Sequence, residues 1–149
     1  MKPVAIGCDE AACALRDIVK EHLSALGYEV TDFGTHDNQP VLYPDVAIEV
    51  AEAVSEGKHD RAILLCGTGI GMAISANKVP GIRAAQAHDT YSAERARKSN
   101  DAQIVTLGAR VVGPELAKSI VSSFMESDFA GGGSMAKVDR IKSYEASKG

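Results

Sequence analysis

The sequence predicts an α/β fold in which about five parallel strands form one sheet with helices on both faces. Five short apolar runs alternate with amphipathic stretches, which is the pattern of successive strand–helix–strand units. The run at residues 61–66 has no polar face after its first residue, as expected of a strand that is covered on both sides. With 149 residues, 45% of them apolar, the chain is predicted to form a single domain over residues 1–149.

Each predicted element of the first half rests on spacing. Strands are predicted at residues 4–7, 28–33 and 61–66. A helix over 11–26 carries Leu15, Val19 and Leu23 at helical spacing, and Gly27 closes it as a C-terminal glycine. A loop rich in Gly, Asn, Asp and Pro covers residues 34–44, and a second helix is predicted at 46–54.

The second half repeats the alternation. A glycine loop at 67–71 leads into a short helix that reaches residue 77, and strands are predicted at 83–87 and 104–107. Helices are predicted at 90–98, with Thr90 as a candidate N-cap, and at 113–125. The three glycines at 131–133 form a hinge or tight turn, and a tail helix begins at about residue 135.

Composition excludes several classes of function. Sixteen basic and 20 acidic residues leave a net charge of −4 without a basic run, which argues against nucleic acid and anionic membranes as partners. No stretch of about 18 apolar residues could span a bilayer, and the N-terminus does not resemble a signal peptide. The three cysteines form no C-x-x-C pair, which argues against a zinc site and favours a reducing, cytoplasmic compartment. No metal-ligand spacing is present, so no metal is expected.

The strongest local signal is the run Cys-Gly-Thr-Gly-Ile-Gly-Met at residues 66–72. Ligands of parallel sheets bind beyond the carboxyl ends of the strands, and this run follows such an end. Alternating glycines let backbone N–H groups point into one concavity, although a tight turn without a ligand gives the same pattern. Its spacing matches neither a P-loop nor a dinucleotide-binding loop. Loop amides would favour the Cys66 thiolate as base or nucleophile, whereas a buried packing role is the alternative. Cys8 and Cys13 lack such a loop, and Cys13 is interpreted as a packing residue.

Other polar residues at strand ends have two interpretations each. Asp9 and Glu10 either transfer protons and bind sugar hydroxyls or form an acidic helix start. His88 either orients a helix start or contacts a ligand, and Asn100 is either a helix C-cap or a ligand donor. The basic residues considered for binding an anion are Arg83, Arg110, Lys137 and Arg140.

Six segments, taken together, resemble the ribose-5-phosphate isomerase B and galactose-6-phosphate isomerase family. They are residues 32–35, 43–45, 66–72, 76–84, 88–93 and 107–113. The resemblance implies a Rossmann-like three-layer sandwich and a cofactor-free aldose–ketose isomerase of a phosphorylated sugar. It also implies a homodimer or homotetramer with active sites at the subunit interface.

The resemblance also implies roles for individual residues. Cys66 would be the base that moves a proton between C1 and C2 through an enediolate. The oxyanion would be stabilised by Asn100 and by the loop amides of Gly67, Gly69 and Gly71. Sugar contacts would come from Asp9, Thr68 and Tyr43. Relatives that use a glutamate base carry it where this chain has Met72.

Three departures from the family pattern bear on the substrate. Residues 8–12 read Cys-Asp-Glu-Ala-Ala where the family commonly reads Ser-Asp-His-Ala-Gly. A histidine thought to open the sugar ring is replaced by Ser99. Two arginines of the C-terminal segment are replaced by Gly133 and Ala136, which leaves Arg110 and Lys137 to share the phosphate.

Because a serine hydroxyl is a poor proton shuttle, the sequence favours a substrate that needs no ring opening. A tetrose phosphate such as erythrulose 4-phosphate or erythrose 4-phosphate cannot close a furanose ring. Ribose 5-phosphate is the alternative, with His88 or Glu10 opening the ring or with spontaneous opening. A second alternative is an inactive or partner-dependent sugar-phosphate-binding subunit.

Overall fold

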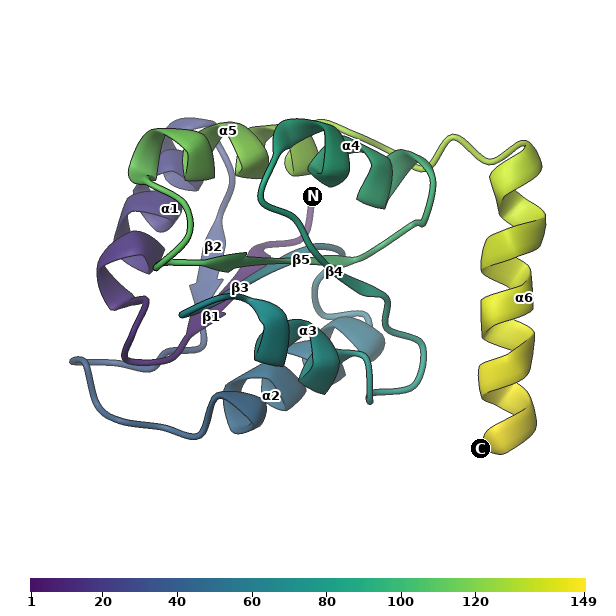
Figure 1. Cartoon of the computed structure of the whole chain (residues 1–149), viewed down its shortest axis with the longest axis horizontal. Coiled ribbons are helices and arrows are strands. Elements are labelled where there is room, and N and C mark those ends of the chain that lie inside the picture. Colours follow the sequence, from purple (N-terminus) through teal and green to yellow (C-terminus); the bar gives the residue numbers. More distant parts are fainter.

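A computed structural model describes residues 1–149 as one parallel sheet surrounded by six helices (Figure 1). The strand order is β2-β1-β3-β5-β4, and every pairing is parallel. The strands are β1 (Val4–Cys8), β2 (Val30–Asp32), β3 (Ala62–Cys66), β4 (Ala84–Gln86) and β5 (Ile104–Gly108). The helices are α1 (Cys13–Ala25), α2 (Tyr43–Ser55), α3 (Ile70–Ala76), α4 (Thr90–Lys98), α5 (Pro114–Met125) and α6 (Gly133–Lys148).

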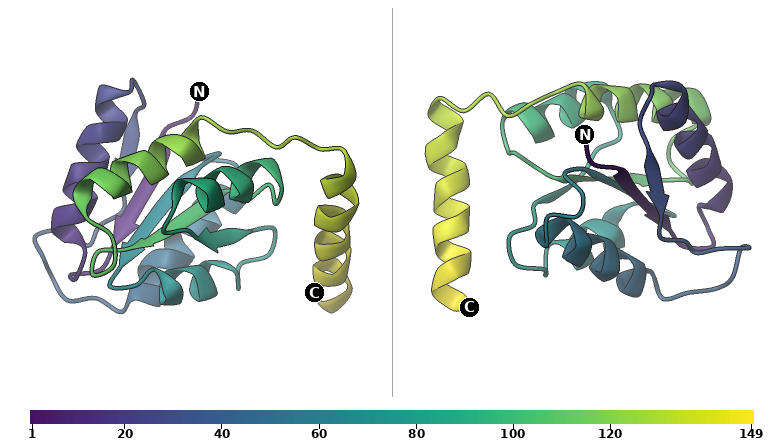
Figure 2. Two further views of the ribbon diagram at one scale, coloured as in Figure 1. Left: turned by 45° about the horizontal axis from the view of Figure 1, so that its top comes forward. Right: turned by 180° about the vertical axis from the view of Figure 1, so that it is seen from behind.

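Helices cover both faces of the sheet, as predicted. On one face α1, α4 and α5 enclose a core of 20 buried residues, and on the other α2 and α3 enclose a core of 14 (Figure 2). The side chains of β3 alternate between these two cores, and all five of its residues are buried. The absence of polar residues at 62–66 is therefore explained by burial on both faces.

Two local predictions are wrong in detail. Helix α2 begins at Tyr43 rather than at residue 46, because Pro44 fits the first turn of a helix, where its missing N–H is not needed. The N-cap of α4 is Asp89 rather than Thr90: the Asp89 carboxylate accepts a hydrogen bond from the Ser92 amide at 2.7 Å. This bond holds the pKa of Asp89 below its usual value.

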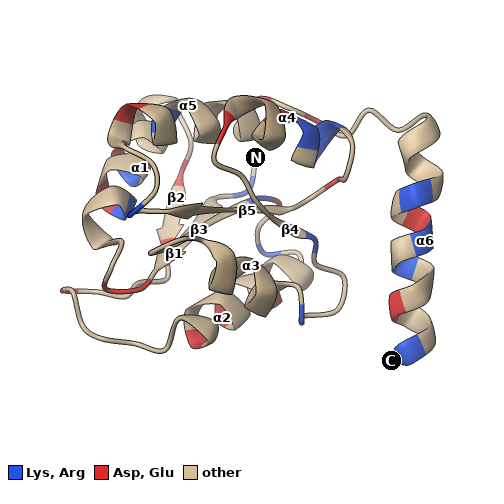
Figure 3. Cartoon of the chain, in the orientation of Figure 1, with Lys and Arg blue, Asp and Glu red and all other residues tan.

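Helix α6 stands beside the rest of the fold, next to the amino ends of the strands (Figures 1 and 2). Its contacts include the Glu145 carboxylate, which accepts a hydrogen bond from the Gly81 amide at 2.9 Å, and the buried Val138. Basic and acidic residues are interspersed along the helix (Figure 3). None of the six helices is long and apolar enough to cross a membrane.

Candidate active site

An open hollow of about 400 Å³ lies at the carboxyl ends of β1 and β3, where the sequence directed attention. It brings together seven of the residues singled out from the sequence, together with two isoleucines of α3. The lining residues are Asp9, Tyr43, Cys66, Gly67, Thr68, Ile70, Gly71, Ile74 and Arg110.

Cys66 ends β3 at the floor of the hollow and is 5% exposed. The Gly69 amide donates a hydrogen bond to its sulfur at 3.1 Å. Gly69 has a φ of +78°, and a Cβ there would lie 2.9 Å from the carbonyl carbon of Leu107. Both the conformation and the close approach to β5 therefore require glycine at this position.

Tyr43 stands over the end of the same loop. A Cβ on Gly71 would overlap the Tyr43 ring, so the glycine creates the space that the ring occupies. Thr68 accepts a hydrogen bond from the Ile70 amide at 3.2 Å through its hydroxyl, which leaves the hydroxyl proton free for a ligand. The alternating glycines thus do more than form the turn: Gly69 places its amide on the Cys66 sulfur, and Gly71 leaves space for the Tyr43 ring.

Asp9 follows β1 and faces the hollow. Its carboxylate accepts a hydrogen bond from the Ala11 amide at 3.0 Å. Burial raises the pKa of Asp9, and this amide opposes the rise only in part. A carboxyl group with a raised pKa exchanges protons more readily near neutral pH than an ordinary aspartate.

Arg110 provides the positive charge of the hollow. Its side chain runs beside Gly67, where a Cβ would lie 3.5 Å from the guanidinium. It is exposed and makes no ion pair or side-chain hydrogen bond within the chain. An unpaired guanidinium beside the glycine loop is suited to an anionic group.

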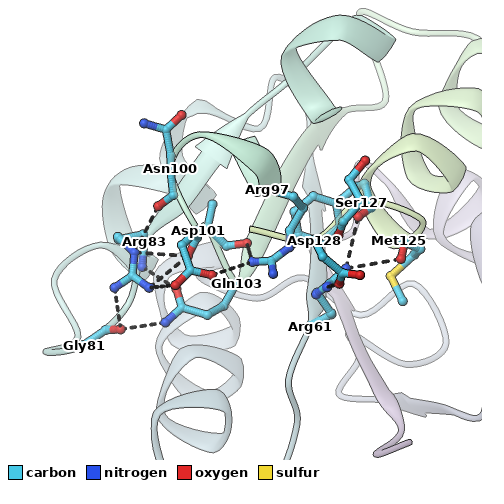
Figure 4. Close-up of polar contacts among 12 residues, drawn as sticks. Arg61, Gly81, Arg83, Arg97, Asn100, Asp101, Gln103, Met125, Ser127 and Asp128 are labelled. Atoms are coloured by element: carbon cyan, nitrogen blue, oxygen red, sulfur yellow. Dashed lines mark hydrogen bonds and ion pairs between the residues drawn. The ribbon is translucent and has the colours of Figure 1, made fainter. Parts of the chain in front are cut away.

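Three predicted residues do not reach the hollow within one chain. Ser99 caps the end of α4 through its backbone, and Asn100 follows it at the amino edge of the sheet. Lys137 is the fifth residue of α6, and this helix also stands at that edge. The Asn100 amide points away from its neighbours and has no hydrogen-bond partner, while its backbone carbonyl accepts from Arg83 Nε at 3.2 Å (Figure 4).

Arg83 is not available to an anion. Its guanidinium donates to the backbone carbonyls of Asn100 and Asp101 and to the Asp101 carboxylate (Figure 4). The side chain is 14% exposed. The interpretation of Arg83 as an anion-binding residue is therefore wrong: it fixes the loop that carries Asn100.

Two further candidates lie near the hollow but outside its lining. The Glu10 carboxylate accepts a hydrogen bond from the Val41 amide at 3.2 Å, and His88 Nε2 accepts one from the Gly108 amide at 3.0 Å. Both side chains are therefore engaged with the backbone, which favours the structural interpretation of each.

The other two cysteines are packing residues. Cys8 and Cys13 are buried with their sulfurs 3.8 Å apart, and burial raises the pKa of Cys8 to about 12. Cys8 therefore ends a strand as Cys66 does but stays a neutral thiol in the core.

Sequence reasoning missed four residues at the site. Ile70 and Ile74 form an apolar wall and are 51% and 58% exposed. Gln86 and Thr106 lie behind the glycine loop and donate hydrogen bonds to its backbone. A polar residue inside the apolar run at 104–107 was the available signal for Thr106.

Comparisons with known proteins agree with the predicted fold and family. A family model described as Ribose/Galactose Isomerase matches residues 4–141. The chain is 56% identical over 148 residues to the D-erythrulose-4-phosphate isomerase of Pectobacterium atrosepticum, covering 97% of this chain and 96% of that protein. It is also 56% identical over 139 residues to a ribose-5-P isomerase B of Listeria innocua, covering 93% and 94%. The structure of Clostridium thermocellum ribose-5-phosphate isomerase B has a TM-score of 0.96 and 46% identity, with 100% of both chains covered.

Proposed function

The chain belongs to the ribose/galactose isomerase family, and on that premise we propose that it interconverts the aldose and ketose forms of a short, open-chain sugar phosphate. The observation that carries the proposal is the hydrogen bond from the Gly69 amide to the Cys66 sulfur, made beside a carboxylate and an unpaired guanidinium. The proposed substrate pair is D-erythrulose 4-phosphate and D-erythrose 4-phosphate.

Cys66 is the proposed base. As a thiolate, stabilised by the Gly69 amide, it removes the proton from C2 of the aldose, and the electron pair moves through C1 onto the carbonyl oxygen. The resulting enediolate regains the proton from the thiol at C1, which yields the ketose. No cofactor takes part, because no electrons leave the substrate.

A second proton must move between the two oxygens of the enediolate. Asp9 is suited to this transfer because burial raises the pKa of its carboxyl group. The hydroxyls of Thr68 and Tyr43 would orient the sugar, and the loop amides would stabilise the negative oxygen. Removing one such donor typically lowers kcat by ~10²–10³-fold.

The remaining groups of the site come from a second copy of the chain in this proposal. Asn100, Ser99 and Lys137 lie at the opposite edge of the sheet from Cys66 and reach it only if another subunit places that edge over the hollow. Two observations support this arrangement: the Asn100 amide has no partner within the chain, and the exposed wall of Ile70 and Ile74 offers apolar surface for burial. We therefore propose a homodimer, or a homotetramer built from it, in which Arg110 and the partner subunit's Lys137 share the phosphate.

Mixing two inactive variants tests the shared site. Cys66→Ala and Asn100→Ala are each expected to be nearly inactive, but a dimer containing one chain of each has one intact site. Co-refolding equal amounts should restore about a quarter of the wild-type activity, because half of the dimers are mixed and half of their sites are intact. Mixed dimers detected by native mass spectrometry without recovered activity would contradict the proposal.

Ser99 supports the choice of a four-carbon substrate. A hydroxyl group cannot shuttle protons at neutral pH as an imidazole does, so the chain lacks a ring opener at this position. The test compares kcat/KM for erythrulose 4-phosphate and ribose 5-phosphate in the wild type and in Ser99→His. We expect at least a tenfold preference for the tetrose in the wild type, about 1.4 kcal/mol, and a smaller one in the variant.

Ribose 5-phosphate is the second candidate, because the Listeria innocua relative is as similar as the erythrulose-phosphate isomerase. Nε2 of His88 and Oε2 of Glu10 each accept a hydrogen bond from the backbone, so a cyclic substrate would depend on the free Oε1 of Glu10 or on spontaneous ring opening. A wild-type preference of tenfold or more for ribose 5-phosphate would make it the substrate.

An inactive or partner-dependent subunit is the alternative from another class. The complete loop from Cys66 to Gly71 argues against it. Incubating the purified homomer with erythrulose 4-phosphate in heavy water decides the matter: an active enzyme incorporates deuterium at the carbon next to the carbonyl, and an inactive subunit does not.

A further inference from the structure

Gln86 and Thr106 have no part in the chemistry described above, yet both contact the glycine loop. Gln86 ends β4, Thr106 lies in β5, and the parallel register pairs these two residues directly. Paired residues of neighbouring strands point to the same face, which here carries α3 and the loop before it. The two side chains therefore reach the same segment of backbone from adjacent strands.

Gln86 holds the peptide group that serves Cys66. Its Nε2 donates to the Thr68 carbonyl at 2.8 Å, and that carbonyl belongs to the same peptide group as the Gly69 N–H. A peptide group is planar, so a hydrogen bond to its C=O directs its N–H, in this case toward the Cys66 sulfur at 3.1 Å. The bond also polarises the N–H and strengthens its donation.

Thr106 holds the next peptide group along the loop. Its hydroxyl donates to the Gly69 carbonyl at 2.7 Å and is fully buried. That carbonyl also accepts the Ala73 amide at 3.1 Å as the first bond of α3. The threonine is therefore not needed to satisfy the carbonyl, but it fixes its direction and with it the left-handed backbone of Gly69.

We propose that Gln86 and Thr106 are positioning residues that hold the Gly69 amide on the Cys66 sulfur and so favour the thiolate. Each of the two peptide groups that flank Gly69 is held by one of them. The inference rests on the proposed function for the purpose of the thiolate, but the arrangement itself is measurable without substrate.

The test measures the rate at which iodoacetamide alkylates Cys66 as a function of pH, resolved by peptide mass spectrometry. Gln86→Met and Thr106→Val remove one hydrogen bond each, and Thr106→Ser retains it. We expect both losses to move the midpoint of alkylation up by about one pH unit, roughly a tenfold slower reaction at neutral pH, and Thr106→Ser to restore it. For the isomerase reaction, kcat should fall in parallel while KM stays constant.

Gln103→Met is the matched control. Gln103 also bonds the backbone through its amide, to the Gly81 carbonyl at 2.7 Å and the Arg83 amide at 2.8 Å, but at the opposite edge of the sheet. It should lower Tm at least as much as Gln86→Met while leaving the alkylation midpoint unchanged. An unchanged midpoint in Gln86→Met, or an equal shift in Gln103→Met, would overturn the proposal.

Two further outcomes remain informative. If Thr106→Val does not fold, Gln86→Met decides alone, because its side chain is exposed and its loss should not unfold the chain. If the midpoints shift as expected in a chain that isomerises no sugar phosphate, the positioning role stands and the proposed function falls.

Discussion

The amino edge of the sheet and the hollow at its carboxyl edge use their charged side chains in opposite ways. At the amino edge Arg61, Arg83 and Arg97 are nearly buried, and each donates to backbone carbonyls and to an aspartate (Figure 4). At the carboxyl edge Arg110 has no partner, and Asp9 is held by only one backbone amide. The amino edge satisfies its polar groups internally and stabilises the fold, whereas the hollow leaves Arg110 and most of the Asp9 carboxylate free for a ligand.

Strand β3 connects the amino edge to the hollow, because it begins directly after Arg61 and ends at Cys66. The comparison therefore predicts that changes at the two ends of β3 have separable effects, one on turnover and one on stability. The unpaired charged groups of the hollow lower the free energy of unfolding, and the paired arginines of the amino edge offset this loss.

The largest effect is expected for Cys66→Ala. Loss of a general base typically lowers kcat by ~10²–10⁴-fold, while replacing a buried thiol by a methyl group leaves the fold intact. Steady-state kinetics and urea unfolding measure both quantities. Cys13→Ala, a second buried cysteine, should retain kcat. Full activity in a well-folded Cys66→Ala protein would rule out the proposed base.

The opposite result, a loss of stability without a loss of turnover, is expected for Arg61→Met. The guanidinium donates to the Phe124 and Met125 carbonyls at 3.1 and 3.2 Å, at the end of α5. Leaving these acceptors without a charged donor should lower the free energy of unfolding by about 1.5–3 kcal/mol without changing kcat. Equilibrium urea denaturation measures the loss, and Lys58→Met, on the surface, serves as the control. A fall in kcat at unchanged stability would break the comparison.

Cys8 is the counterpart of Cys66 in this comparison, because it also ends a strand at the carboxyl edge but is buried in the core and stabilises the fold. Its pKa is raised to about 12 by burial, from 9.0, so the thiol stays neutral in the folded state while it ionises in the unfolded chain. Its contribution to stability is present below pH 9 and is lost as the pH rises toward 12, by up to about 1.4 kcal/mol per pH unit. Urea unfolding at several alkaline pH values should show a shallower decline for Cys8→Ala, and an unchanged decline would refute the assignment.

A smaller effect is expected for Lys137→Ala. A lysine binds phosphate as a point charge, so its loss should raise KM by about tenfold or less and leave kcat nearly unchanged. Lys142→Ala on the same helix is the control, with no expected change. Equal turnover of phosphorylated and unphosphorylated sugars by the wild type would contradict a phosphate site of any kind.

No effect at all is expected from chelators. No group of three or more His, Cys, Asp or Glu side chains is placed to hold a metal ion. Activity after dialysis against EDTA should equal that before it. Inactivation that a divalent ion reverses would show that the charge at the carboxyl edge is completed by a metal.

The fold was largely predictable from the sequence, because a sheet covered by helices on both faces requires strands that are almost entirely apolar. The runs that became β1 and β3 are apolar throughout since both of their faces are buried, and β5 departs from this pattern only at Thr106. Helix boundaries were less accurate, because Pro44 is compatible with both a loop and a first helical turn, and Asp89 and Thr90 are both good caps. In the fold Pro44 lies in the first turn of α2, and the hydrogen bond from the Ser92 amide makes Asp89 the cap of α4.

The hollow was predictable in part. Cys66 and its loop were identified from spacing, because a cysteine at the carboxyl end of a strand, followed by alternating glycines, adds a second signal to a pattern that a tight turn alone also gives. Arg83 was misread because a sequence does not show which arginines find partners inside the fold. The separation of Asn100 and Lys137 from Cys66 was equally hidden, because one chain's sequence does not reveal which residues act across copies.

The strand order has a consequence for how the chain folds as the ribosome makes it. Strand β5 lies between β3 and β4, so β4 has no neighbour in the sheet until β5 has been synthesised. Strands β2, β1 and β3 can pair as soon as about the first 66 residues have emerged, whereas residues 84–103 must wait for the segment that follows them. At ~5–20 residues per second this exposes an unpaired strand for about a second or more, the interval in which a nascent chain of this topology is open to misfolding and to chaperones.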